Sequence, residues 1–166
     1  MAESVAESGR EGGCACGQVR YRVEAEPLFV NQCHCTLCQR QSGSAFAVNL
    51  FVESGHLRLL AGEVVEITVP TGSGAEQAII RCKTCGTALW SHYGRLGRGG
   101  AAVRVGTLDD PGAVRPDAAI HVATRLPWVP LPEGVPAFET HYKPSDLLPQ
   151  DRYRRLMTII EGNAQA

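Results

Sequence analysis

Apolar and polar residues alternate along much of the chain with the two-residue period of a β-strand. The segment 18–24 is the clearest case, since Val19, Tyr21 and Val23 are separated by polar residues, as in a strand with one solvent-facing side. Further short strand-like runs, many of them bounded by glycine, cover residues 28–32, 45–52, 57–60, 64–69, 77–81, 87–92 and 101–105. The pattern predicts a mainly β fold in a single domain.

A helical period replaces this alternation near the C-terminus. Four apolar residues there fall at positions i, i+3, i+4 and i+7: Tyr153, Leu156, Met157 and Ile160. Gly162 follows as a stop signal, so we expect a short amphipathic C-terminal helix. Its arginines are interpreted as a solvated face: Arg152, Arg154 and Arg155. We therefore expect a disordered polar leader over 1–12, one domain over 13–145 and a helical tail over 146–166.

Length and charge narrow the class of protein. The 166 residues suit one domain with a buried core. Sixteen Lys and Arg against seventeen Asp and Glu leave a formal net charge of −1, with no basic run, which argues against nucleic-acid binding. The apolar stretch Ala45–Val52 is too short to span a bilayer, and residues 1–12 lack the apolar core of a signal peptide. We expect a soluble cytoplasmic protein with no membrane or nucleic-acid partner; its oligomeric state is left open.

The seven cysteines change this picture, because they occur in three tight clusters and nowhere else. The clusters are Cys14 with Cys16; Cys33, Cys35 and Cys38; and Cys82 with Cys85. Disulfides explain an odd number of cysteines poorly, the more so in a cytoplasmic protein. Close, paired spacing is instead typical of metal ligands.

The first and last clusters together predict a closed metal site. Each is a pair of cysteines followed directly by glycine, in the segments Cys14-Ala15-Cys16-Gly17 and Cys82-Lys83-Thr84-Cys85-Gly86. Two such turns, brought together by strand pairing, would supply four thiolates in a tetrahedron, which suits structural zinc. The 66 residues between Cys16 and Cys82 mean that this metal would join the start of the domain to its middle and stabilise the fold.

The middle cluster predicts a second, open site. Cys33, Cys35 and Cys38 supply three thiolates, one fewer than a tetrahedron needs, and catalytic zinc sites characteristically keep one position free. Zinc stabilises a bound thiolate near neutral pH, so such a site would hold a small-molecule thiol as a nucleophile. Three alternatives remain: metal-free redox-sensing thiols, a different partition of the seven ligands, or a fourth ligand from His34, His56, His92, His121 or His141.

Three other side chains are candidates for the site. His34 lies between two of the cysteines and could act as an acid or base, although loop histidines are more often surface or hydrogen-bonding residues. Trp90 and Trp128 could line a substrate cleft, but core packing is the commoner role of tryptophan.

The three cysteine motifs, in this order, resemble those of the glutathione-dependent formaldehyde-activating enzyme family, which also includes centromere protein V. The matching segments are Gly12–Tyr21 with Cys14-Ala15-Cys16-Gly17, Cys33–Arg40 with Gly43 and Phe46, and Cys82–Leu89. The segments 106–111 and 116–138, with His121 and Trp128, are similar to the trailing part of the same family. The resemblance covers residues 12 to 142.

The resemblance implies a fold of packed antiparallel sheets held by zinc. It implies a structural zinc on Cys14, Cys16, Cys82 and Cys85 and a catalytic zinc on Cys33, Cys35 and Cys38. The implied activity is that of a carbon–sulfur lyase: glutathione adds to formaldehyde to give S-hydroxymethylglutathione, or the adduct is cleaved. A similar small thiol or another aldehyde fits the same chemistry.

A non-catalytic zinc-binding module that mediates protein interaction is the alternative function. The missing fourth cysteine in the middle cluster favours the enzyme, whereas a protein ligand at that position would favour the module. A chromatin-associated factor is disfavoured, because the chain has no basic segment.

Overall fold

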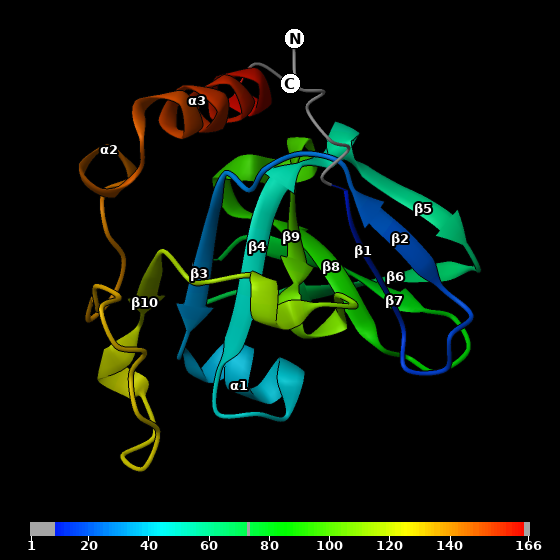
Figure 1. Cartoon of the computed structure of the whole chain (residues 1–166), viewed down its shortest axis with the longest axis horizontal. Coiled ribbons are helices and arrows are strands. Elements are labelled where there is room, and N and C mark those ends of the chain that lie inside the picture. The colour runs from blue at the N-terminus through cyan, green and yellow to red at the C-terminus, as the bar shows by residue number, and fades with distance from the viewer. Residues whose placement is uncertain (1–8, 73, 165–166) are drawn as a thin grey trace, which may run out of the picture.

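A computed structural model describes residues 9–72 and 74–164, and within these residues two β-sheets pack face to face (Figure 1). The smaller sheet has the strand order β1-β2-β5, with β1 (Arg10–Gly13), β2 (Arg20–Val23) and β5 (Leu57–Ala61). The larger sheet has the order β10-β3-β4-β9-β8-β7-β6. Its strands are β3 (Phe29–Cys33), β4 (Ala47–Glu53), β6 (Val64–Pro70), β7 (Glu76–Cys82), β8 (Ala88–Tyr93), β9 (Gly100–Arg104) and β10 (Ala118–Ile120).

Neighbouring strands run antiparallel except for β10, which lies parallel to β3. The helices are α1 (Thr36–Ser42), α2 (Pro144–Leu147) and α3 (Gln150–Ala164). Short 3-10 turns cover Ser54–His56 (η1), Gly94–Gly99 (η2), Val105–Thr107 (η3), Pro111–Ala113 (η4) and Val122–Thr124 (η5). The mainly β fold with antiparallel sheets and a short C-terminal helix is thus confirmed.

The main core fills the space between the two sheets. Tyr21 from β2 is fully buried and meets Trp90 from β8 edge to face, with ring centroids 5.8 Å apart. Leu50 and Val52 from β4 and Val103 from β9 complete the apolar layer around them. The expected core role of Trp90 is therefore confirmed.

The C-terminal helix α3 packs against the larger sheet through a second apolar cluster that joins Leu156 to Phe51 and Leu96. Arg152 also forms a bidentate ion pair with Asp117, at 2.7 and 3.1 Å. Arg155 forms one with Glu53, with both distances 2.7 Å.

The interpretation of all three arginines as a solvated face is therefore wrong for two of them. Arg152 and Arg155 lie at the margin of the helix–sheet contact, where carboxylates on the sheet side face them. Arg154 is exposed, as expected.

The disordered leader expected over residues 1–12 is wrong for its last residues. Residues 10–12 lie in β1 rather than in a disordered segment, whereas residues 1–8 lie outside the described part of the chain. Arg20 and Arg22 on β2 both hydrogen-bond to Glu11. Gly12 packs so closely on Tyr21 that a Cβ there would lie 2.5 Å from its hydroxyl oxygen. The strand thus forms from polar residues and glycine because β2 pairs with it and neutralises its charge, although its residues are only partly exposed or buried.

No helix in the described residues is long and apolar enough to cross a membrane.

Candidate metal centres

The first and last cysteine clusters meet at one end of the two sheets. Cys14 follows β1 and Cys82 ends β7, and the sulfurs of Cys14, Cys16, Cys82 and Cys85 all lie within 4.8 Å of one another. Cys16 Sγ lies 3.4 Å from Cys14 Sγ and 3.8 Å from Cys82 Sγ. The predicted pairing of these two turns, 66 residues apart, is therefore present in the folded chain.

The two turns have similar backbone geometry. Gly17 and Gly86, the residues directly after each cysteine pair, have φ values of 77° and 74°, a left-handed conformation that favours glycine. The Gly17 amide donates to the Cys14 carbonyl at 3.0 Å, and the Gly86 amide donates to the Cys82 carbonyl at 2.9 Å. Each turn therefore folds back on its first cysteine and aims both sulfurs at the same point.

Neighbouring donors favour anionic sulfur at two members of this group, Cys14 and Cys85. The Val19 amide donates to Cys14 Sγ at 3.2 Å, and the Cys85 amide donates to Cys82 Sγ at 3.4 Å. The Thr87 hydroxyl lies 3.1 Å from Cys85 Sγ, and hydrogen bonding from Thr87 lowers the pKa of Cys85 to about 5. Four converging sulfurs with amide and hydroxyl donors fit a tetrahedral thiophilic ion such as zinc.

The middle cluster forms a separate group at the junction of β3 and α1. Cys33 ends β3, Cys35 is the N-cap of α1, and Cys38 lies in the first turn of that helix. The three sulfurs lie within 4.8 Å of one another. Cys35 Sγ accepts a hydrogen bond from the Cys38 amide at 3.3 Å, so the cap that starts the helix also orients two of the three candidate ligands.

The three sulfurs share their protons unequally. Hydrogen bonds from Cys33 and then Cys38 lower the pKa of Cys35 to about 2, and the same contact with Cys35 raises the pKa of Cys33. All five histidines lie in the described residues, and none of their nitrogens joins either sulfur group within 4.8 Å. The middle group therefore has three protein donors.

His34 points away from the surface, contrary to the expectation for a loop histidine. It is fully buried, its ring contacts that of Phe46 at a tilt of 50° with centroids 5.3 Å apart, and neither ring nitrogen has a hydrogen-bond partner. Burial, followed by the charge of Arg125, lowers its pKa. Its backbone carbonyl accepts hydrogen bonds from Gln39 and from Thr124, which fixes the loop between Cys33 and Cys35.

A polar network that the sequence patterns did not reveal connects α1 to the sheet. Arg104 on β9 donates to Asn49 Oδ1 at 2.6 Å and to Gln41 Oε1 at 2.9 Å, and Gln41 donates to Gln77 Oε1 at 2.8 Å. Asn49 and Gln77 are buried. The pKa of Cys38 is raised overall: hydrogen bonding with Cys33 lowers it, but contact with Cys35 and burial outweigh this effect, and the charge of Arg104 opposes the rise only weakly.

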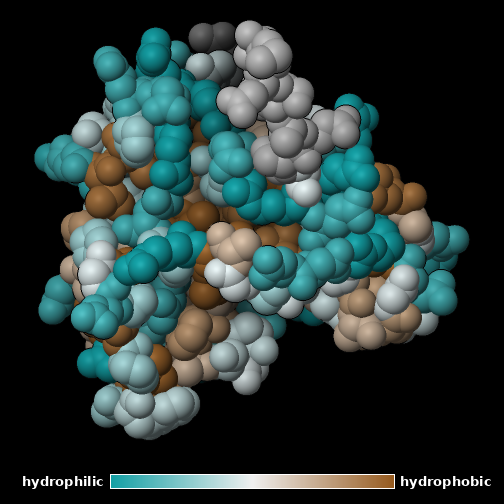
Figure 2. All heavy atoms as spheres, viewed as in Figure 1, coloured by the Kyte–Doolittle hydropathy of each residue, from teal (hydrophilic) through white to brown (hydrophobic). Residues whose placement is uncertain are grey.

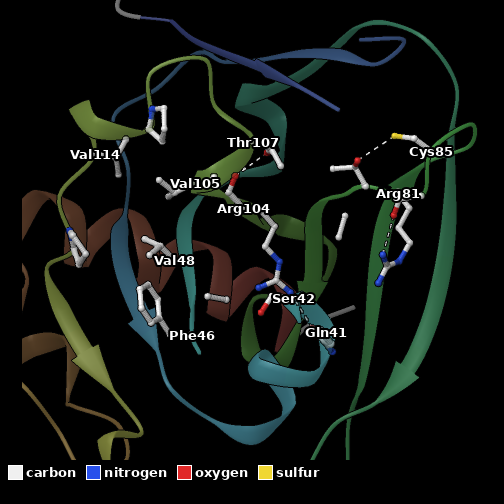
Figure 3. Close-up of a pocket in the computed structure, with 17 residues that line it drawn as sticks. Gln41, Ser42, Phe46, Val48, Arg81, Cys85, Arg104, Val105, Thr107 and Val114 are labelled. Atoms are coloured by element: carbon white, nitrogen blue, oxygen red, sulfur yellow. Dashed lines mark hydrogen bonds between the residues drawn. The ribbon is translucent and has the colours of Figure 1, made fainter. Parts of the chain in front are cut away.

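A cavity of about 720 Å³ lies beside this network (Figure 3). Gln41 and Ser42, the last two residues of α1, line it, and so does Cys85 of the four-sulfur group, whereas Cys33, Cys35 and Cys38 are not among its lining residues. Its apolar wall includes Phe46, Val48, Val105 and Val114, while Arg81 and Arg104 supply positive charge. Figure 3 shows Arg104 reaching towards Gln41, with Arg81 on the neighbouring strands.

Two further groups belong to the segment after β10. His121 Nε2 lies 3.0 Å from His141 Nε2, and His121 is the single non-glycine residue with positive φ, 55°, among the described residues.

Trp128 is 72% exposed, so the core role expected for it is wrong. The proline-rich loop that carries Trp128 folds against β10 through backbone bonds instead of covering this side chain.

The sequence matches the profile of the family described as "Glutathione-dependent formaldehyde-activating enzyme" over residues 9–124. A Halomonas elongata protein, provisionally named a glutathione-dependent formaldehyde-activating enzyme, is 33% identical over 84 residues, which are 48% of this chain. The match spans about half of that relative's length, 54%. A crystal structure of a Rhodobacter sphaeroides protein aligns at 25% identity with a TM-score of 0.44, covering 64% of this chain and 91% of that one.

The family match covers well over half of the chain, and all seven cysteines lie inside it. Because the profile and the provisionally named relative agree, the chain belongs to the glutathione-dependent formaldehyde-activating enzyme family.

Proposed function

We propose that the chain is a zinc-dependent carbon–sulfur lyase or synthase. It forms or cleaves the adduct of glutathione, or of a similar small thiol, with formaldehyde or another aldehyde. The observation that carries the proposal is a group of three sulfurs with no fourth protein donor at the start of α1, the helix whose last residues, Gln41 and Ser42, line a cavity of about 720 Å³. A closed, purely structural site would have four protein ligands.

The two sulfur groups take different roles in this proposal. Cys14, Cys16, Cys82 and Cys85 hold a structural zinc that joins the start of the chain to β7. Cys33, Cys35 and Cys38 hold the catalytic zinc at the N-terminus of α1. A zinc ion bound there supplies a cation that lowers the pKa of the substrate thiol and so makes its sulfur a nucleophile near neutral pH.

The chemistry requires few further groups. The thiolate sulfur attacks the aldehyde carbon, and the carbonyl π bond breaks. The resulting alkoxide takes up one proton, which balances the proton that the thiol lost. Cleavage of the adduct reverses each of these steps. The chain's contribution is to place the two reactants side by side and to keep positive charge near the sulfurs, through Arg104 beside Cys38.

The cavity supports a thiol that carries carboxylates. Arg81 donates to the Gly86 carbonyl, and Arg104 donates to amide oxygens of Asn49 and Gln41. Among the described residues neither guanidinium has a carboxylate partner. A ligand with carboxylates and a short apolar body, as glutathione is, matches both the charge and the lining of this cavity.

The zinc content per chain tests the proposal directly. Wild type and Cys35→Ser are purified without added metal, and zinc and thiol–aldehyde adduct formation are measured on both. We expect two zinc ions in the wild type and one in the folded, inactive variant. One zinc in both proteins, or full activity in Cys35→Ser, contradicts the catalytic role of the middle group. A folded protein with both zinc ions but no adduct chemistry would point to the binding module.

A further inference from the structure

Exposed apolar side chains are concentrated on two neighbouring edge strands. Of the five large apolar side chains exposed in the described residues, Leu59 and Leu60 lie on β5, and Val65 and Ile67 lie on β6. β5 ends the smaller sheet and β6 ends the larger one, and the two strands meet at the right of Figure 1. Figure 2 shows apolar surface on this side of the molecule, where β5 lies. Apolar surface at a sheet edge is typical of a site for another strand.

The β6 edge lacks the features that usually prevent strand pairing. It runs for seven residues, pairs with β7 in unbroken register from Val64 to Pro70, and contains no lysine and no bulge. Its single charged residue, Glu66, is already neutralised by Arg98 at 2.6 and 2.7 Å. Proline stands only at the last position, where it ends the strand. Natural edges are normally blocked by charge, bulges or internal proline.

The hydrogen-bond pattern identifies which backbone groups are free. The Lys83 amide donates to the Glu63 carbonyl, and the Thr71 amide donates to the Ala75 carbonyl, at the two ends of the β6–β7 ladder. Hydrogen-bonded pairs alternate along an antiparallel ladder, so the odd-numbered residues of β6 bond to β7. The amides of Glu66 and Thr68 therefore point away from the sheet, towards solvent.

We propose that two copies of the chain pair through β6, antiparallel, around a two-fold axis at Ile67. In this register Glu66 of each copy exchanges both backbone hydrogen bonds with Thr68 of the other, and Val64 donates to the Pro70 carbonyl. Proline has no N–H, so this terminal pair forms one hydrogen bond instead of two. Val65 faces Val69 of the other copy, and the two Ile67 side chains meet at the axis, at a pair position where side chains lie close together.

Charge selects this register over its neighbours. Centring the axis on Glu66 would place two carboxylates directly opposite each other, which is unfavourable. Centring it on Thr68 would move Val64 opposite Gly72, beyond the end of the strand. With the axis at Ile67 no like charges lie opposite each other. The apolar residues on one side of β6, Val65, Ile67 and Val69, contact those of the other copy. The surface is thus complementary to itself, as a closed two-fold dimer requires.

The mass of the full chain in solution, with its metal bound, tests the proposal by light scattering and sedimentation over a range of concentrations. We expect a reversible dimer with twice the chain mass of 17.8 kDa, dissociating on dilution. Thr68→Pro removes one outward amide without touching the β7 ladder, and Ile67→Lys places two ammonium groups at the axis. Both variants are expected to halve the mass, to 17.8 kDa. Trp128→Lys, which removes the most exposed apolar side chain elsewhere, is the matched control and keeps the dimer.

Amide hydrogen exchange on the wild type tests the same proposal without depending on whether any variant folds. In the dimer the amides of Glu66 and Thr68 are protected at high concentration and exchange after dilution, whereas the Ile67 amide is protected in both conditions. A monomer throughout, with freely exchanging Glu66 and Thr68 amides, overturns the proposal. A dimer that survives Ile67→Lys but not Trp128→Lys overturns it as well, as do open-ended aggregates in place of a dimer.

Discussion

Arg104 donates a hydrogen bond to Gln41 Oε1 at 2.9 Å, although the two residues are 63 positions apart in the sequence. This bond joins strand β9 of the larger sheet to α1, the helix that carries Cys38. The same guanidinium donates to buried Asn49 at 2.6 Å. Because these two bonds leave from different guanidinium nitrogens, a lysine at this position cannot form both in the same geometry. Together with the hydrogen bond from Gln41 to Gln77, this side chain fixes the position of α1 over the sheet.

Arg104→Lys is expected to leave the chain folded and to weaken binding of the thiol substrate. Loss of a charged hydrogen bond in a half-buried site costs about 1.5–3 kcal/mol, so we expect KM for the thiol to rise by roughly tenfold to a hundredfold. Steady-state kinetics measure this change. Arg40→Lys, an exposed arginine on the same helix, is the control and should leave KM unchanged. An unaltered KM in Arg104→Lys would show that the cavity does not bind the substrate through this residue.

Cys82→Ser is expected to impair folding, whereas Cys35→Ser is expected to impair only activity. Cys82 is 1% exposed and belongs to the four-sulfur group, so its loss should release a metal whose binding is coupled to folding. Cys35 belongs to the three-sulfur group, which the proposal makes catalytic, so its loss should abolish activity while the fold persists. Circular dichroism melts and zinc content distinguish the two results. A folded Cys82→Ser protein with its full zinc content would reverse the assigned roles.

Thr87 is expected to affect metal retention without being a ligand. Its hydroxyl lies 3.1 Å from Cys85 Sγ, and its oxygen accepts a hydrogen bond from the Ala15 amide at 3.3 Å, so it touches both turns of the four-sulfur group. Partners of this kind are worth ~10–100-fold in metal affinity, and Thr87→Val should weaken zinc binding by about that factor. Competition with a chromophoric chelator measures it. Thr84→Val, in the same turn but with its side chain exposed, should retain zinc as the wild type does.

The ion pair between Arg155 and Glu53 should contribute to stability in a pH-dependent way. Burial raises the pKa of Glu53, but the hydrogen bonds and charge of Arg155 outweigh it and hold this pKa below 4.5. A carboxyl group whose folded pKa is depressed stabilises the fold above its unfolded pKa and loses that effect as the pH falls through the lowered value. The partly exposed pair is worth about 1 kcal/mol.

Arg155→Gln should therefore be less stable than wild type at neutral pH, and the difference should shrink below pH 4.5. Denaturant unfolding of both proteins across this range tests it. Comparing the proteins at each pH cancels acid effects common to both, such as loss of metal. Arg154→Gln, on the exposed side of the same helix, should track the wild type. A difference that grows in acid would contradict the assignment of Glu53 as the titrating partner.

The sequence predicted those parts of the molecule that depend on local pattern. The strand over 57–60 is β5, and the two cysteine turns meet because glycine gives each the same path. Strand β1 escaped prediction because Arg10–Gly13 has no apolar alternation and is held by β2. Helix α1 escaped because it is short and its cap is a cysteine, not one of the usual capping residues.

The network around the candidate site could not be read from local pattern at all. Arg104, Gln41 and Gln77 are ordinary polar residues on three different elements, and only the folded sheet order brings them together. The same holds for Arg152 and Asp117, 35 positions apart. Pattern analysis places a polar residue in water by default, so it finds partnered surface arginines only when the fold is known.

The anchoring of the Cys33–Cys38 loop has a consequence for how this protein is made. The loop's carbonyl at His34 is held by Thr124, 90 positions later, and its amide bonds to Ile120. On the ribosome the four-sulfur group can close once Cys85 has emerged, but the three-sulfur loop is still without these anchors. The order of the chain therefore allows the four-sulfur group to assemble before the three-sulfur loop gains its anchors at Ile120 and Thr124.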